Sequence, residues 1–73
     1  MQDTLVECRS EFTYAQQPVR FMWLENWLEV ESILDQWKSP QSSCFRVMTT
    51  AKDIFELYYL EDRDIWQVKS IKS

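Results

Sequence analysis

Residues 18–38 read PVRFMWLENWLEVESILDQWK and hold three of the four tryptophans of this 73-residue chain. As strands, the stretch is a hairpin that turns at Glu25-Asn26, with Phe21 and Trp23 on one face before the turn. Leu28 and Val30 then alternate after the turn. The alternation slips beyond Val30, which predicts a β-bulge near Glu31-Ser32. Trp23 and Val30 are expected to hold the core.

The same stretch also has a helical pattern. Trp23, Trp27, Val30, Leu34 and Trp37 follow one another at spacings of four, three, four and three, which describes an amphipathic stripe. A helix over 24–38 in an α+β fold is therefore the alternative. The chain contains no glycine, so tight hairpin turns are expected to use Asn or Asp in the left-handed region or longer loops, which mildly favours the helix.

The rest of the chain reads as short strands separated by turn residues. The expected strands are Leu5 to Tyr14, Cys44 to Thr50, Ile54 to Leu60 and Ile65 to Ile71. The expected breaks are Ala15 to Pro18, the loop Ser39 to Ser43, Ala51 to Asp53 and the polar turn Glu61 to Asp64. Strands at this spacing predict a single all-β domain over 1–73, an antiparallel meander of five or six strands curled into an open barrel.

The order of these elements resembles a known type of sequence. The segments YAQQPVRF-W, V-x-x-I-L-x-x-W, FRV, FELYY and a later D-x-W are similar to a small, uncharacterised prokaryotic all-β family. The resemblance covers about Tyr14 to Val68 and implies a hairpin over 18–38, whose turn in that family typically contains glycine. Glu25-Asn26 stands there in this chain, and Asn tolerates the left-handed region. The resemblance implies no activity.

The charge and cysteine content limit the partners and the compartment. Twelve acidic and eight basic side chains give a net charge of −4, which makes a phosphate-backbone partner unlikely on electrostatic grounds. No apolar run approaches the ~20 residues of a membrane span, and the start of the chain lacks signal-peptide character. A cytoplasmic protein is therefore expected, with Cys8 and Cys44 as reduced thiols. Cys8 is expected in the core, and Cys44, beside a loop, nearer the solvent.

The residues that enzymes and metal sites use are scarce here. There is no histidine, so neither cysteine has an imidazole base, and two isolated thiols do not complete a zinc site. Glu29, Glu31 and Glu56 are interpreted as solubilising charges, and the acidic turn 61–64 lacks the spacing of a calcium loop. We expect no enzyme, no cofactor and no bound metal.

Protein binding is the leading functional hypothesis. Eleven aromatic residues are more than a 73-residue meander easily buries, and an exposed apolar patch often marks a partner site. The same surface could pair two copies in a homodimer. The candidate partner surface consists of Met22, Leu24, Trp27, Trp37, Ile54, Tyr58 and Leu60.

Single-stranded nucleic-acid binding is the alternative hypothesis. Small barrels bind single strands by stacking bases on exposed aromatic rings that are flanked by Arg or Lys. The candidate face for this function consists of Arg9, Arg20, Arg46, Lys52 and Tyr58.

Overall fold

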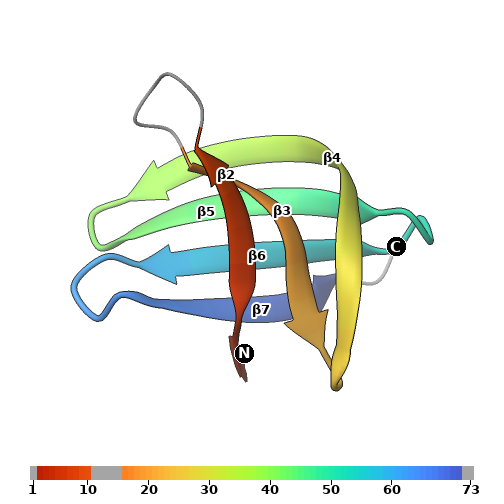
Figure 1. Cartoon of the computed structure of the whole chain (residues 1–73). Helices are drawn as coiled ribbons and strands as arrows, with labels where there is room; N and C mark the ends of the chain where they lie inside the picture. The colour runs from red at the N-terminus through yellow and green to blue at the C-terminus, as the bar shows by residue number, and fades with distance from the viewer. Residues whose placement is uncertain (1, 11–15, 72–73) are drawn as a thin grey trace.

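The computed structural model describes residues 2–10 and 16–71, and all of their regular structure is β-sheet (Figure 1). The strands are β1 (Gln2–Thr4), β2 (Val6–Ser10), β3 (Gln16–Trp23), β4 (Asn26–Ser39), β5 (Ser42–Thr49), β6 (Ile54–Leu60) and β7 (Ile65–Ile71). The predicted all-β fold is confirmed, and the alternative helix over 24–38 is wrong. Within the described ranges there is accordingly no helix long and apolar enough to cross a membrane.

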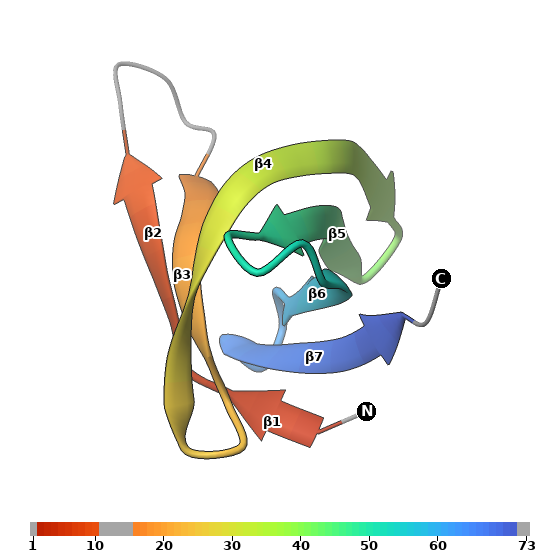
Figure 2. The ribbon, with the colours of Figure 1, turned by 90° about the vertical axis from the view of Figure 1, so that its right-hand side faces the viewer.

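The strands form one antiparallel sheet in the order β1-β7-β6-β5-β4-β3-β2. Only Leu5 separates β1 from β2, yet β1 pairs with β7 and β2 pairs with β3. The first segment therefore joins both ends of the sheet into a nearly closed barrel. Figure 2 shows β4 curving from the β2–β3 side over to β5. The sheet has seven strands where five or six were expected, in part because β1 precedes the first expected strand, which was predicted to begin at Leu5.

The stretch 18–38 is a hairpin, as predicted, but its turn lies one residue earlier. Trp23 is opposite Asn26, so the turn residues are Leu24 and Glu25, with φ angles of 49° and 67°. Positive φ at both central residues is the signature of a type I′ turn. The expectation that only Asn or Asp would adopt this conformation is wrong. Asn26 instead donates a hydrogen bond from Nδ2 to the carbonyl oxygen of Leu24, at 3.2 Å.

Two irregularities bend the long strand β4. Its register against β5 shifts between Val30 and Ser32, which confirms the bulge predicted near Glu31-Ser32, and shifts again between Ile33 and Asp35. An extra residue in one strand of an antiparallel pair increases the local twist and bend. Residues 26–29 of β4 can therefore pair with β3, while residues 30–39 pair with β5.

The core lies inside the barrel and is largely aromatic. Phe21 and Trp23 both meet the ring of Phe55 edge-on, with ring centroids 5.1 and 5.2 Å apart. Trp66 stands between Phe45 and Tyr59. Trp23 and Val30 pack against the buried residues, as expected; the buried cluster consists of Phe21, Phe45, Val47, Phe55, Leu57 and Val68.

Several predicted boundaries need correction. Pro18 is not a break but a buried residue of β3, opposite Cys8 beside a bulge. Because β3 begins to pair with β4 only at Arg20, the missing N–H of Pro18 interrupts no hydrogen bond between β3 and β4. The expected loop at 39–43 is a two-residue turn at 40–41. The bounds of β6 and β7 agree with the prediction, whereas residues 11–14 of the first expected strand lie outside the described residues.

Candidate interaction surface

Three of the large hydrophobic side chains that reach the solvent gather where β1 bends into β2. Leu5 is 66% exposed, Leu24 is 65% exposed and Trp27 is 41% exposed. Met22 is directly opposite Trp27 in the β3–β4 ladder, on the same outer face. We call Leu5, Met22, Leu24 and Trp27 the hydrophobic patch. Among the described residues, Leu34 is a further exposed large hydrophobic side chain, but it lies at the second bulge of β4.

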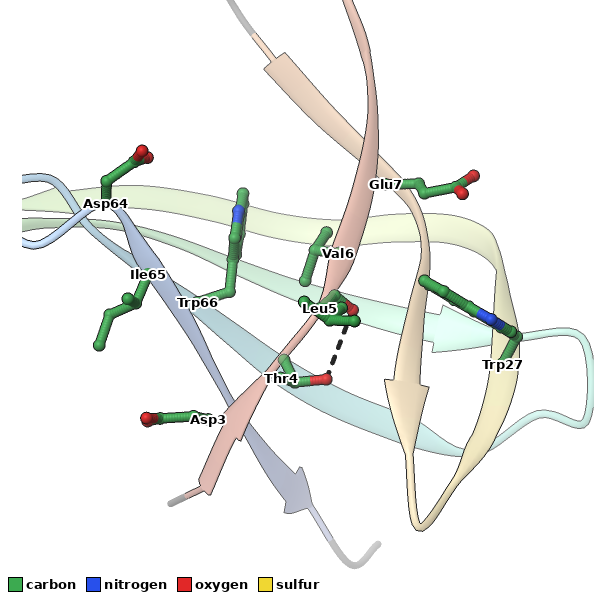
Figure 3. Close-up of a pocket in the computed structure, with 9 residues that line it drawn as sticks. All are labelled: Asp3, Thr4, Leu5, Val6, Glu7, Trp27, Asp64, Ile65 and Trp66. Carbon is green, nitrogen blue, oxygen red and sulfur yellow. Dashed lines mark hydrogen bonds between the residues drawn. The ribbon is translucent and has the colours of Figure 1, made fainter.

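Two open grooves meet at this patch and share Asp3, Thr4 and Leu5. The first, of about 540 Å³, extends from Trp27 past the bend to the start of β7 at Ile65 (Figure 3). The second, of about 570 Å³, extends from the bend to the β3–β4 turn. Leu5 therefore lies between the two grooves and connects them into one surface.

Backbone contacts hold the patch in place. The amide of Met22 donates to the carbonyl oxygen of Leu5 at 2.9 Å. The hydroxyl of Thr4 donates to the carbonyl oxygen of Met22. These two bonds attach the bend to the end of β3, next to the type I′ turn that fixes the position of Leu24. The patch is thus supported by the elements that close the barrel.

The grooves are acidic. Carboxylates of Asp3, Glu7, Glu25 and Asp64 line them, and no lysine or arginine is among their described lining residues. Glu7 accepts hydrogen bonds of 2.6 and 3.1 Å from Arg20, which lowers the pKa of Glu7. The guanidinium of Arg20 also lies over the ring of Trp27, 5.1 Å from its centroid. Trp27 is therefore held in position by a charged neighbour while much of it stays open to solvent.

A second cluster occupies the outer face of β4, β5 and β6. Trp37, Cys44 and Tyr58 are opposite one another across the three strands, and Cys44 is only 1% exposed. The expectation that Cys44 would be the more exposed cysteine is wrong, because Cys8 is half-buried. The Arg46 guanidinium lies 5.8 Å from the ring centroid of Trp37 and is bonded to Glu56.

The polar groups of this second cluster are mutually paired. The Tyr58 hydroxyl donates to one oxygen of Glu56, and Arg46 donates to the other. The hydrogen bonds from Tyr58 and then Arg46 lower the pKa of Glu56. Burial, followed by the bond to Glu56, raises the pKa of Tyr58 to about 12. Among the described residues, every buried side-chain nitrogen and oxygen has a hydrogen-bond partner. We therefore interpret this cluster as part of the packed structure.

The residues of the predicted partner surface fall in different places. Met22, Leu24 and Trp27 belong to the hydrophobic patch. Trp37, in the part of β4 that pairs with β5, and Tyr58, in β6, belong to the second cluster. Ile54 and Leu60 are half-buried at opposite ends of β6. The structure thus brings three of the seven together.

The cations of the predicted nucleic-acid face are also separated. Arg46 neighbours Tyr58 through Glu56, whereas Arg20 lies at the hydrophobic patch. Lys52, in the β5–β6 turn, forms a salt bridge of 2.5 Å with Glu31. The backbone of Arg9 lies in β2, but its side chain is outside what the structure describes.

Sequence reasoning missed Leu5 and the acidic residues around it. The available signal was the pair Leu5-Val6, two adjacent apolar residues that cannot both face the core of one regular strand. The carboxylates of the grooves come from the β1–β2 segment and two turns, so their proximity depends on barrel closure. Among the described residues, no three Cys, Asp or Glu side chains are grouped to hold a metal ion.

Comparisons of the chain with protein families, curated proteins and solved structures find no match. The resemblance to an all-β prokaryotic family is neither supported nor contradicted by them. The functional argument therefore depends on the geometry of the surface alone.

Proposed function

We propose that this protein is a non-catalytic interaction module that binds a protein partner through the hydrophobic patch. Leu24 is the observation that carries the proposal. A leucine at positive φ costs about 1 kcal/mol relative to residues that suit the left-handed region, and its side chain is 65% exposed, so burial compensates little of that cost. A partner that covers Leu24 explains why leucine occupies this position.

The surroundings of Leu24 support the same function. Leu5 and Trp27 add two further exposed hydrophobic side chains, and Met22 contributes a flexible thioether. Aromatic residues and methionine are enriched at the centres of protein interfaces. The proposal includes a cytoplasmic location, which the free thiols of Cys8 and Cys44 support, because disulfides are rare in that compartment.

Position-specific photo-crosslinking tests the proposal. A photoreactive amino acid replaces Leu24 in one version of the protein and Ala51, exposed in the β5–β6 turn, in a control version. We expect discrete crosslinked products in cells of the source organism from position 24 only, and we expect Trp27→Ser to remove them. Equal labelling from both positions, or no product from position 24, contradicts the proposal.

A homodimer is the form of this function in which the partner is a second copy. Light scattering at increasing protein concentration distinguishes it. A dimer that dissociates in the Leu24→Asn variant assigns the patch to self-association, whereas a monomer at all concentrations excludes this form.

Single-stranded nucleic-acid binding is the second candidate. The observation in its favour is the guanidinium of Arg20 over the partly exposed ring of Trp27, 5.1 Å from the centroid, since such proteins combine aromatic stacking platforms with cations. A titration with short single-stranded DNA and RNA at low salt tests it through tryptophan fluorescence. Quenching that is lost in Trp27→Leu supports this function, and no quenching at micromolar protein removes it.

A further inference from the structure

We infer that the segment bound by the hydrophobic patch is a basic one: an extended polypeptide whose apolar side chains are flanked by lysine or arginine. This inference rests on the proposed function and adds the chemistry of the partner. Three features support it: the charge of the groove residues, the like-charge repulsion in a symmetric dimer, and the shape of the grooves.

The charged side chains that line the two grooves have one sign, and Arg20, whose guanidinium lies over Trp27, is paired with Glu7. The four groove carboxylates surround the exposed side chains of Leu5 and Trp27. Figure 3 shows Asp3 and Asp64 on one side of the Leu5–Val6 segment and Glu7 on the other. Within the described residues only Glu7 of the four has a salt bridge, to Arg20. A partner with cations beside its apolar residues would complement this arrangement, and an acidic partner would be repelled.

The same charge argues against a second copy as the occupant. In a two-fold symmetric dimer the same patch lies on both sides of the interface. The carboxylates of Asp3, Glu25 and Asp64 would then approach those of the other copy, with no lysine or arginine among the described groove residues to compensate. Like charges brought together across an interface oppose association.

The shape of the site suits an extended chain. β2 is the last strand of the sheet order and has β3 as its neighbour. The first groove follows this segment from Thr4 to Glu7 and reaches the start of β7. Extended peptides commonly bind beside the free edge of a sheet, where alternate side chains enter pockets. Leu5 and Trp27 would contact the apolar side chains of such a segment, and the carboxylates would contact its cations.

Selection from a random peptide library displayed on phage, with the full chain as bait, tests the inference. The patch variant is Leu24→Asn, which suits the positive φ at this position and therefore keeps the turn. The charge variant removes three groove carboxylates without changing side-chain size: Asp3→Asn, Glu25→Gln and Asp64→Asn. The matched control removes three carboxylates that do not line the grooves: Glu31→Gln, Asp35→Asn and Asp53→Asn.

We expect selected peptides that combine apolar residues with lysine or arginine. Their affinity should fall about tenfold in Leu24→Asn, as for a central interface contact, and about fivefold in the charge variant or at high salt, but stay within about twofold in the control. Neutral or acidic peptides that still depend on Leu24 overturn the basic partner and leave the interaction function standing. A homodimer that dissociates in Leu24→Asn likewise overturns the basic partner and leaves the interaction function standing. Selected basic peptides whose affinity is unchanged in Leu24→Asn, or a selection that yields no peptide, overturn both the basic partner and the interaction function.

Discussion

Arg46 and Glu56 are opposite each other in the β5–β6 ladder, and the guanidinium of Arg46 donates hydrogen bonds of 2.7 and 3.1 Å to one oxygen of Glu56. Tyr58 donates to the other oxygen. Glu56 is only 7% exposed, so its charge depends on these partners. Removing the charge is expected to weaken the fold more than removing a solvent-exposed carboxylate.

We predict that Glu56→Gln lowers the free energy of unfolding at pH 7 by about 1–3 kcal/mol, as expected for hydrogen bonds to a charged group. Because the pKa of Glu56 is lower in the folded protein than its ordinary value of 4.5, its contribution is complete above pH 4.5. The contribution is lost as the pH falls through the folded pKa. Urea unfolding from pH 7 to pH 2 should show the two proteins converging in acid. Glu31→Gln, an exposed control, should change little, and an equal loss in both variants would contradict the prediction.

We predict that Tyr58 weakens the fold in alkali. Its pKa is raised from 10.0 to about 12, so its contribution to stability is complete below pH 10 and is lost as the pH rises through 12. Absorbance of tyrosinate at 295 nm should show a late titration that is missing in Tyr58→Phe. That variant should also lose stability less steeply between pH 10 and pH 12. A tyrosine at position 58 that titrates near pH 10 would contradict the half-buried, hydrogen-bonded environment of Tyr58.

We predict that Leu24→Asn stabilises the protein by about 0.5–1 kcal/mol, because asparagine suits the first central position of a type I′ turn. For a domain of this size the melting temperature should rise by about 2–8 °C. Thermal unfolding followed by circular dichroism measures this change. Leu24→Val, which is β-branched and unsuited to positive φ, should lower the melting temperature. If both variants destabilise equally, leucine contributes to the fold in a way that turn conformation does not explain.

We predict that the two cysteines differ in reactivity. Burial raises the pKa of the Cys8 thiol above its ordinary value of 9.0, so little reactive thiolate is present near pH 8. Cys44 is 1% exposed and should react only after unfolding. Ellman's reagent with Cys8→Ser and Cys44→Ser variants separates the two rates. The rate of Cys8 should still be rising above pH 9, and fast labelling of Cys44 in the native protein would contradict its position.

We predict that Leu57→Ala costs about 2–5 kcal/mol, the range for a buried leucine whose removal leaves a cavity. Leu57 is fully buried in the aromatic core. The matched control, Leu34→Ala, makes the same chemical change at a side chain that is 48% exposed and should cost about 0.5 kcal/mol or less. Urea denaturation of the three proteins provides the comparison. Similar losses in both variants would place Leu57 outside the core.

The helical stripe in residues 18–38 does not correspond to one face of the hairpin, because Trp23 and Val30 pack against the core while Trp27 lies on the outer face. A regular strand returns to the same face every two residues, but one extra residue at a bulge changes that interval to three. Val30 is opposite Thr49 and Ile33 is opposite Val47, so both face the core across the first bulge. Intervals of three within an apolar segment imitate a helix. The bulge near Glu31 was predictable from the slip in alternation, whereas the second bulge, between Ile33 and Asp35, was not predicted.

Strands bounded by polar turns were the easiest to predict. β6 is a run of apolar and aromatic residues interrupted only by Glu56, and it ends at the charged turn 61–64, so its bounds follow from those two signals. The turn at Leu24-Glu25 was not predictable, because residues disfavoured at positive φ occupy it. The candidate surface was predictable only in part, since Asp64 and Ile65 lie near Leu5 only after β1 has paired with β7. Such long-range pairings leave no local pattern in the sequence.

The pairing of β1 with β7 also affects the rate at which the protein folds. The β3–β4 and β4–β5 pairs are hairpins with two-residue turns, so their contacts need only short loops to close. Gln2 and Val68, by contrast, meet across nearly the whole chain, and the entropy of closing that loop must be overcome before the barrel is complete. Small β-proteins dominated by such distant contacts fold in about milliseconds to seconds. The first groove, which extends from Trp27 and Leu5 to the start of β7, is therefore complete only once this pairing has formed.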